Sequence, residues 1–243
     1  MTTFVKGSVG LTLVDTKLAG AIAGPSFRSR RLGPEWEMVE RFLSELPIRI
    51  ATGCDAIVFQ EPRLPSGFPD LVIVIWDRKK AARWRQERAT LTTLDLRLAH
   101  YIYQSGPSTE GKLRRVFARS VSESIERLNA SGILRTSGAR WLLRPLSGIF
   151  AARQIIAVEA KVSKWKAALR QAELNTWFAS VSYILVPEVP RRSLLLEMAG
   201  RLGIGVWTKN HAPLKPRQPE QLPRSYVSWL FNEWAWRASA RTE

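Results

Sequence analysis

Charged side chains stand at the ends of two apolar segments that are predicted to be β-strands. Asp70 opens the segment 70–76 (DLVIVIW), and Glu159 and Lys161 close the segment 154–161 (QIIAVEAK). Successive side chains of a strand point to opposite faces, so Glu159 and Lys161 are expected on one face. If the two strands are neighbours, the carboxylates of Asp70 and Glu159 converge. Their mutual repulsion raises one pKa unless a cation lies between them.

A divalent metal ion would relieve that repulsion. Mg²⁺ (or Mn²⁺) binds one or two carboxylates together with water and phosphate oxygens, so Asp70 and Glu159 are the candidate metal ligands. A lysine beside such an ion, here Lys161, can orient or help deprotonate an attacking water and stabilise developing charge. Two plainer interpretations stay open: Asp70 as an ordinary turn acid, and Glu159 with Lys161 as a simple ion pair on a strand.

The segments around these residues predict the elements that must position them. Apolar residues at three- and four-residue spacing indicate a helix at 35–46, which begins after Pro34 and ends before Pro47. The further predicted elements of this part of the chain are strands at 55–60, 70–76, 154–161, 181–186 and 204–208, helices at 163–178 and 191–202, an extended crossing at 212–223, and an amphipathic helix at 226–240 that carries Trp229, Trp234 and Trp236.

A different pattern interrupts this series after the charged run 77–88, which is read as a linker or an exposed helix. Residues 91–145 predict three helices, at 91–104, at 109–117 and from Ser120 onwards, followed by a hairpin around Ser137 and Gly138. Ser120 and Glu123 have the spacing of a capping box. Three helices followed by a hairpin resemble the winged-helix domains of many bacterial transcription factors.

The motifs FPDLVIVIW and IIAVEAK, in the order helix, strand, Pro-Asp strand, Glu-x-Lys strand, helix, strand, resemble the PD-(D/E)XK signature of the restriction-endonuclease-like superfamily. The match covers residues 32–77 and 154–208. The resemblance implies an α/β fold: a restriction-endonuclease-like core, with a mixed central sheet flanked by helices, formed by residues 1–80 and 150–243. A winged helix-turn-helix domain at 88–146 would occupy the turn that normally joins the Asp strand to the Glu-x-Lys strand.

The same resemblance implies two further site residues. An acidic residue is expected on the first helix, for which Glu37 in GPEWEMVERFL is the choice, with Glu35, Glu40 and Glu45 as competitors. A glutamine is often found on the helix after the lysine, and Gln171 has that position.

The charge of the chain favours a polyanionic partner. Its 243 residues include 37 Lys and Arg against 21 Asp and Glu, a net charge of +16. Such an excess favours binding to the phosphates of a nucleic acid, while the plainer interpretation, that the charge serves solubility, stays open. In the winged helix, the third helix would enter the major groove and the hairpin would contact phosphates. The alternative is a domain for protein contacts only, because Glu123 and Glu126 on that helix would repel phosphate. The candidate DNA-binding residues are Lys112, Arg114, Arg115, Arg119, Ser122, Arg127, Arg135, Arg140, Lys164 and Lys166.

Together these features predict a metal-dependent endonuclease that hydrolyses DNA. The alternatives are a non-catalytic DNA-binding protein or subunit on the same fold, and a nuclease for RNA or single strands. The segment SWLFNEWAW suggests a homodimer or a partner protein, unless it packs on its own sheet. One cysteine excludes an intrachain disulfide and, with two histidines, disfavours structural zinc. No signal peptide or membrane span is expected, which suggests a cytoplasmic protein, nucleoid-associated in a bacterium.

Overall fold

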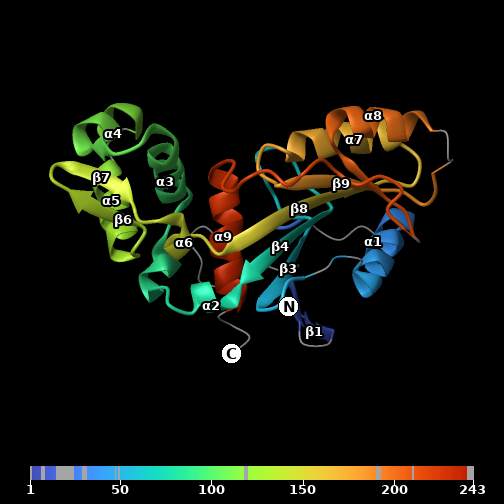
Figure 1. Ribbon diagram of the computed structural model, residues 1–243, viewed down its shortest axis with the longest axis horizontal. Coiled ribbons are helices and arrows are strands. Elements are labelled where there is room, and N and C mark those ends of the chain that lie inside the picture. The colour runs from blue at the N-terminus through green and yellow to red at the C-terminus, as the bar shows by residue number, and fades with distance from the viewer. Residues whose placement is uncertain are drawn as a thin grey trace.

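A seven-stranded mixed sheet forms the centre of the molecule, and a separate three-stranded sheet lies at one end (Figure 1). The computed structural model describes residues 2–6, 9–14, 25–28, 32–46, 48, 50–117, 120–189, 193–209 and 211–239. The large sheet has the order β1-β2-β3-β4-β8-β9-β10. Its strands are β1 (Thr2–Lys6), β2 (Val9–Val14), β3 (Cys54–Gln60), β4 (Leu71–Asp77), β8 (Ala152–Ala160), β9 (Val181–Leu185) and β10 (Gly205–Trp207). The predicted α/β fold with a mixed central sheet flanked by helices is confirmed.

Helices cover both faces of this sheet. The core on one face includes residues of α1 (Pro34–Glu45), and the core on the other includes residues of α9 (Tyr226–Ser239). Because β3 and β4 are buried on both faces, their sequences are nearly continuous apolar runs instead of alternating ones. Helices α7 (Trp165–Asn175) and α8 (Leu194–Leu202) pack against β9 and β10. Among the described residues, no helix combines the length and the apolar character that crossing a membrane requires.

The chain between β4 and β8 forms a second lobe, seen at the left of Figure 1. This inserted lobe, residues 93–143, has its own sheet in the order β5-β7-β6. The chain reaches it through α2 (Arg78–Ala81) and the 3₁₀ helix η1 (Gln86–Thr90), and returns through α6 (Leu146–Ile149). The two-residue strand β5 was not predicted. The elements of the lobe are α3 (Thr93–Ser105), β5 (Ser108–Thr109), α4 (Glu110–Phe117), α5 (Val121–Ala130), β6 (Leu134–Ser137) and β7 (Arg140–Leu143).

The capping box lies on a different helix from the predicted one. Ser120 is at the N-cap of α5, but its side chain accepts no capping hydrogen bond there. The box is formed instead at the start of α3, where the Asp95 N–H donates to Thr92 Oγ1 and the Thr92 N–H donates to Asp95 Oδ2. Asp95 is fully buried, and its carboxylate also accepts two hydrogen bonds from Arg127 of α5. This cap therefore also ties α3 to α5.

Helix α9 is buried on all sides, so the prediction of an amphipathic helix was wrong. Every residue from Val227 to Ala238 is buried, and Trp229, Trp234 and Trp236 belong to the chain's own core. The helix stands between the large sheet and the inserted lobe (Figure 1), in contact with β4, β8 and α3. The folded helix therefore offers no tryptophan surface to a dimer or a partner protein, and the alternative that it packs on its own sheet holds.

A buried ion pair links α9 to the connection between sheet and lobe. Arg88 of η1, expected in an exposed charged run, is only 1% exposed, and its Nε lies 3.0 Å from Glu233 Oε2. Its guanidinium also donates to the Ile149 carbonyl and lies 3.5 Å from the centre of the Trp84 ring. On the preceding residue of α9, Asn232 Oδ1 accepts from the N–H groups of residues 151 and 152, just where β8 begins.

We expect Glu233→Gln to destabilise the fold by roughly 3–5 kcal/mol, because it leaves the buried Arg88 charge without its counter-ion. The matched control is Glu197→Gln, which breaks the exposed pair with Arg201 on α8 and should cost less than about 1 kcal/mol. Urea denaturation of the two variants and the wild type measures the free energy of unfolding. Equal losses in both variants would contradict a structural role for the buried pair.

Candidate active site

Asp70, Glu159 and Lys161 come together where β4 begins and β8 ends. Leu71 and Val158 are the outermost paired residues of these antiparallel strands, so Asp70 and Glu159 follow directly at the same edge. Asp70 Oδ2 accepts a hydrogen bond of 2.7 Å from the Ala160 N–H, and the Lys161 Nζ lies 3.6 Å from the same oxygen. The predicted convergence of these segments is therefore present, although a whole lobe separates them along the chain.

The Lys161 ammonium turns toward α1, and the expected face shared with Glu159 is not formed. Strand β8 ends at Ala160, so the alternation of a strand no longer dictates where Lys161 points. Its Nζ donates to the Ala160 carbonyl (2.8 Å) and to Glu35 Oε2 (3.3 Å). The ion pairs of Lys161 are thus with Glu35 and Asp70, which differs from the simple pair with Glu159 that the sequence left open.

Glu159 points to the other side of the sheet, into the packing of α7. It is 2% exposed, and its Oε1 accepts a 2.7 Å hydrogen bond from Asn175 Nδ2. Burial raises the pKa of Glu159 to about 8, and the negative charge of Asp70 contributes to the rise. The Asn175 amide and the Lys161 charge act in the opposite direction but do not balance it. The repulsion between the two carboxyl groups that the sequence predicted is therefore part of this site.

The pKa values of Asp70 and Lys161 are both raised, and the lysine stays charged. Burial raises the pKa of Asp70 above its usual range, and the nearby Lys161 charge and Ala160 N–H offset only part of this effect. Burial by itself would lower the pKa of Lys161, but the carboxylates of Asp70 and Glu35 outweigh it and leave that pKa above its usual range. At neutral pH the side chain is a charged hydrogen-bond donor.

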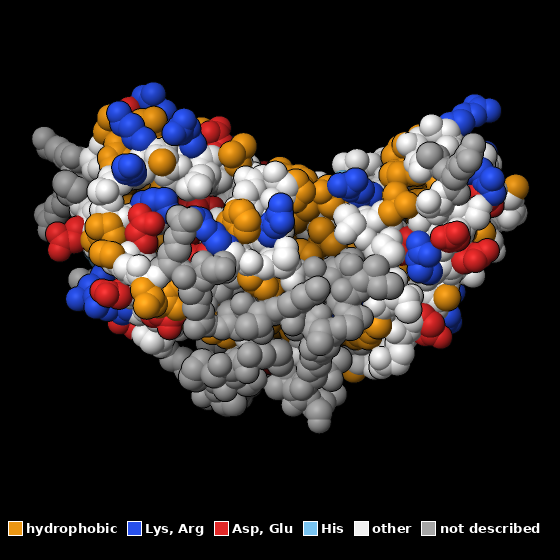
Figure 2. All heavy atoms as spheres, turned by 180° about the vertical axis from the view of Figure 1, so that it is seen from behind, with side chains coloured by type: hydrophobic (Ala, Val, Ile, Leu, Met, Phe, Trp, Pro, Cys, Tyr) orange, Lys and Arg blue, Asp and Glu red, His pale blue; other side chains and the backbone are white. Residues whose placement is uncertain are grey.

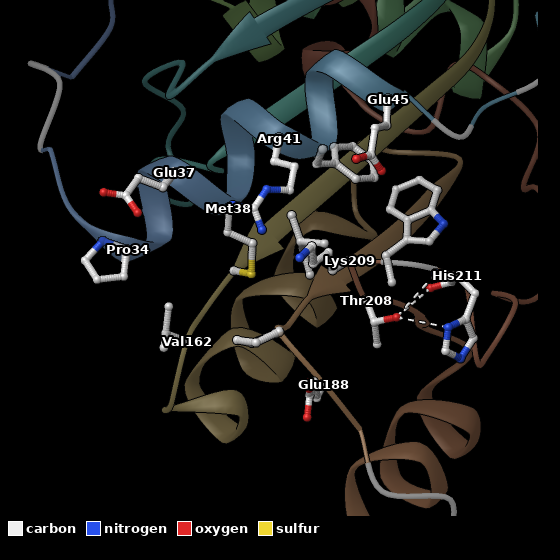
Figure 3. A pocket seen from close by; sticks show the side chains of 14 residues that line it. Pro34, Glu37, Met38, Arg41, Glu45, Val162, Glu188, Thr208, Lys209 and His211 are labelled. Atoms are coloured by element: carbon white, nitrogen blue, oxygen red, sulfur yellow. Dashed lines mark hydrogen bonds between the residues drawn. The ribbon is translucent and has the colours of Figure 1, made fainter.

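Glu35 is the acid that α1 brings to these residues, whereas Glu37 faces elsewhere. Two residues of a helix that are two positions apart point about 200° apart, so only one of the pair can reach Lys161. Glu37 is exposed and lines a separate, larger pocket (Figure 3). Glu35 and Glu37 lie on either side of Trp36 in the sequence. The rotation of α1 about its axis determines that Glu35 is the one that reaches Lys161.

Gln171 also lies outside the site. It is exposed on α7, while Asn175, one helical turn later, is buried and holds Glu159. The expected helix therefore supplies a side-chain amide, but from a different residue. The apolar pattern of α7, with Ala168, Leu169 and Ala172 buried, was the available signal, because it places position 175 on the inner face.

A small cavity of about 140 Å³ opens beside Asp70 and Lys161, and sequence analysis missed several of its lining residues. Arg28 is held there by a bridge between Phe27 and Pro62 and by a 3.1 Å hydrogen bond from its N–H to the Glu61 carbonyl. Gln60, at the end of β3, has a buried Oε1 with no hydrogen-bond partner among the described residues. Arg28 follows no predicted element, so nothing in the sequence indicated its position. The cavity is lined by Arg28, Glu35, Trp36, Val39, Gln60, Glu61, Asp70, Ala160 and Lys161.

Some of the predicted DNA-binding residues are engaged in contacts within the inserted lobe. Arg127 is paired with the buried Asp95, and Ser122 is hydrogen-bonded to Glu110 and Arg114, so Arg127 and Ser122 do not form a free phosphate-binding set. Arg119 lies outside the described residues. The exposed members are Lys112, Arg114, Arg115, Arg135, Arg140, Lys164 and Lys166.

These exposed residues lie on both lobes. Lys164 and Lys166 belong to the start of α7, whereas the other exposed candidates belong to α4 and the β6–β7 hairpin. Seen from behind, the upper outline of the molecule is hollowed between the two lobes, and Lys and Arg side chains stand on both sides of the hollow (Figure 2). Positive charge is therefore spread over the molecule instead of being confined to the inserted lobe.

Among the described residues, no group of three or more His, Cys, Asp or Glu side chains lies close enough to hold a metal ion by itself. An ion at Asp70 would need oxygen atoms from other sources, such as an amide, water or a substrate. Comparison of the chain with protein-family models, curated proteins and solved structures gave no match. A functional proposal therefore depends on the geometry described above.

The raised pKa of Glu159 predicts how stability changes with pH in the metal-free protein. The folded chain keeps a proton on Glu159 up to about pH 8, while the unfolded chain loses it near the ordinary value of 4.5, so stability should fall as pH rises between these values. Glu159→Gln removes the penalty and should stabilise the fold at pH 7 by roughly 2–3 kcal/mol, with no gain near pH 4. Urea unfolding in EDTA from pH 4 to 8.5 measures this. Glu173→Gln, at an exposed position of α7, is the control that should keep the wild-type slope.

A second pair of variants tests which amide of α7 supports the site. Asn175→Ala leaves the buried Glu159 carboxyl without its donor and should cost about 1–3 kcal/mol. Gln171→Ala removes an exposed side chain and should change stability by less than about 0.5 kcal/mol. If thermal or urea unfolding gives the two variants the same stability, the assignment of Asn175 as the positioning residue is wrong.

Proposed function

We propose that this protein is a metal-dependent endonuclease of the PD-(D/E)XK type that hydrolyses phosphodiester bonds of DNA. One observation carries the proposal: Asp70 and Lys161, distant in sequence, lie 3.6 Å apart at the end of β8, with Glu159 at the adjoining position. An acid, a second acid and a charged amine at one sheet edge are the residue types that such hydrolysis requires.

The order of elements supports the same family. Helix α1, strands β3, β4 and β8, helix α7 and strand β9 follow each other along the chain, with the inserted lobe between β4 and β8. Strands β3, β4 and β8 are antiparallel neighbours, and β9 lies parallel to β8. The resemblance noted in the sequence implied this series of helix, three strands, helix and strand for a restriction-endonuclease-like core.

The residues at the cavity fit a hard divalent cation such as Mg²⁺ or Mn²⁺. Asp70 supplies a carboxyl group there, and Gln60 contributes a buried amide oxygen without a hydrogen-bond partner among the described residues. Glu159, which repels Asp70, would be the second carboxylate only if its side chain turned from Asn175 toward the cavity. Such an ion binds one or two carboxylates, carbonyl or amide oxygens and water. When bound, it would polarise the scissile phosphate and activate a water molecule.

The chain's own cations would bind and orient the phosphate. Lys161 stays protonated, so its role is to donate a hydrogen bond and stabilise negative charge, not to accept a proton from water. Arg28 adds a second positive charge to the same cavity, and its planar guanidinium suits a phosphate. Both charges offset the repulsion that Glu35, Glu61 and Asp70 would otherwise exert on a nucleic acid.

The inserted lobe would act as a winged helix that positions duplex DNA. Its order of helix, short strand, two helices and hairpin, with the short strand paired to β7, supports this assignment. Because α5 exposes Glu123 and Glu126, we place the phosphate contacts on α4 and on the hairpin, at Lys112, Arg115, Arg135 and Arg140. Cutting both strands of a duplex needs two sites, so a homodimer belongs to the proposal, through a surface other than α9.

Lys161→Ala should abolish cleavage, with a rate loss of at least about 100-fold, while leaving DNA affinity largely unchanged. Lys79→Ala on α2, an exposed lysine beyond the end of β4 that is opposite to Asp70, is the matched control and should cut at the wild-type rate. Plasmid cleavage with Mg²⁺ or Mn²⁺ measures the rate, and fluorescence anisotropy with labelled duplex in EDTA measures affinity. Cleavage by Lys161→Ala at the wild-type rate would refute the site.

A non-catalytic DNA-binding protein on the same fold is the second candidate, and one observation favours it. Glu159 is almost fully buried and held by Asn175, so the second carboxyl group faces α7 and not the cavity. Calorimetric titration with Mn²⁺ separates the candidates, using Asp70→Asn and Glu159→Gln as the variants. Binding that depends on both residues supports the endonuclease, and its absence supports the non-catalytic protein.

A further inference from the structure

A larger cavity, of about 310 Å³, lies beside the candidate active site (Figure 3). One wall is the face of α1 that carries Met38 and Arg41, and the opposite wall is formed by the segments that follow β8, β9 and β10. These three strands are parallel, so their carboxyl ends lie at one edge of the sheet. Ligands of open α/β sheets bind in crevices at such an edge.

Residues that are neighbours in the chain line the two cavities at this edge. Lys161 lines the smaller cavity, and Val162, the next residue, lines the larger one. On α1, Glu35 and Trp36 belong to the smaller cavity, while Glu37 belongs to the larger. A chain molecule with one group at Lys161 could therefore place its neighbouring group beside Val162, at the larger cavity.

The floor of the larger cavity is apolar and aromatic. Met38, Phe42, Leu185 and Trp207 line it. Trp207 is fixed by stacking on Tyr183, with ring centroids 3.6 Å apart and planes 2° apart, and by contact with Phe42 at 4.7 Å. Such rigid apolar and aromatic walls suit a flat ring with apolar faces.

The rim carries charged groups that are free to bind. Arg41, Glu188 and Lys209 are exposed, and their side chains have no hydrogen-bond or ion-pair partner among the described residues. Figure 3 shows Met38 and Arg41 extending from α1 into the cavity, with Glu188 on the opposite side. Carboxylate and guanidinium groups are those that bind the polar edge of a nucleobase.

We propose that this cavity binds an unpaired nucleobase, that of the nucleotide next to the phosphate held at Lys161 and Arg28. The inference rests on the proposed function and refines its substrate: single-stranded or locally opened DNA, since a paired base cannot leave the duplex stack without being unpaired. The base stacks against the apolar floor, and its polar edge meets Arg41 and Glu188 at the rim.

The test uses a three-nucleotide strand in which only the middle nucleotide carries a base, the fluorescent analogue 2-aminopurine. Binding is measured in EDTA, so that it does not depend on cleavage, and it is compared with that of the fully abasic strand. The wild type should quench the 2-aminopurine fluorescence and bind the base-bearing strand roughly five- to 100-fold more tightly, the range expected for one stacked base.

Two variants on the wall opposite α1 locate the binding. Val162→Trp fills the cavity from an exposed position (43% exposed) and should remove both the quenching and the gain in affinity. Glu188→Ala should reduce the gain in affinity for the base-bearing strand and leave the phosphate contact at Lys161 unchanged. The control, Leu202→Trp, introduces the same ring at a similarly exposed position of α8 (38%) and should behave as the wild type. Unchanged quenching in Val162→Trp, or equal affinity for the abasic strand, would overturn the inference.

Cleavage with Mn²⁺, measured separately, distinguishes the two proposals. Base binding that depends on the cavity, in a protein that cuts no DNA, supports the cavity and refutes the endonuclease. Cleavage that depends on Lys161, in a protein that binds the abasic strand equally well, supports the endonuclease and refutes the base site.

Discussion

The pairing of β4 with β8 holds the candidate active site together. Its register pairs Leu71 with Val158 and so brings Asp70 near Ala160, across 90 positions of sequence, where the side chain of Asp70 accepts from the Ala160 N–H. The same register leaves Glu159 buried beside a second carboxyl group, which is why its pKa rises. A shift of this register by one residue would reverse every side chain of the strand and separate these groups.

Helix α9 gives both lobes a common support. Its apolar residues fill the core between the large sheet and α3, and its polar residues act inside the protein: Asn232 binds the start of β8, and Glu233 neutralises Arg88 of the connection. Polar groups at such depth are costly unless each has a partner. The buried contacts of Asn232 and Glu233 therefore fix how the chain leaves β4 and returns to β8.

Five strands of the large sheet, β3, β4, β8, β9 and β10, were predicted from the sequence, because runs such as β3, β4 and β8 are long and apolar. Helix α1 was predicted because prolines bound it, whereas strands β1 and β2 were not predicted. The helix at 226–240 was predicted as well, but its complete burial was not, since Asn232 and Glu233 are polar residues that suggest a solvent-facing side while they serve buried partners. Glu37 was preferred to Glu35, and Gln171 was named without Asn175 being considered. Both choices depended on the rotation of a helix about its axis, which tertiary packing sets. Strand β5 has two residues, too few for any periodicity.

The inserted lobe joins the sheet at the end of β4 and the beginning of β8, whereas Asp70 and Glu159 stand at the opposite ends of these strands. Strand β4 has seven residues, which at about 3.3 Å per residue separate the two places by roughly 23 Å. With about 3.4 Å between successive base pairs, this length corresponds to about seven of them. In the proposed endonuclease, the length of β4 would therefore help to set the distance along a bound duplex between the contact of the inserted lobe and the backbone position that reaches the acids.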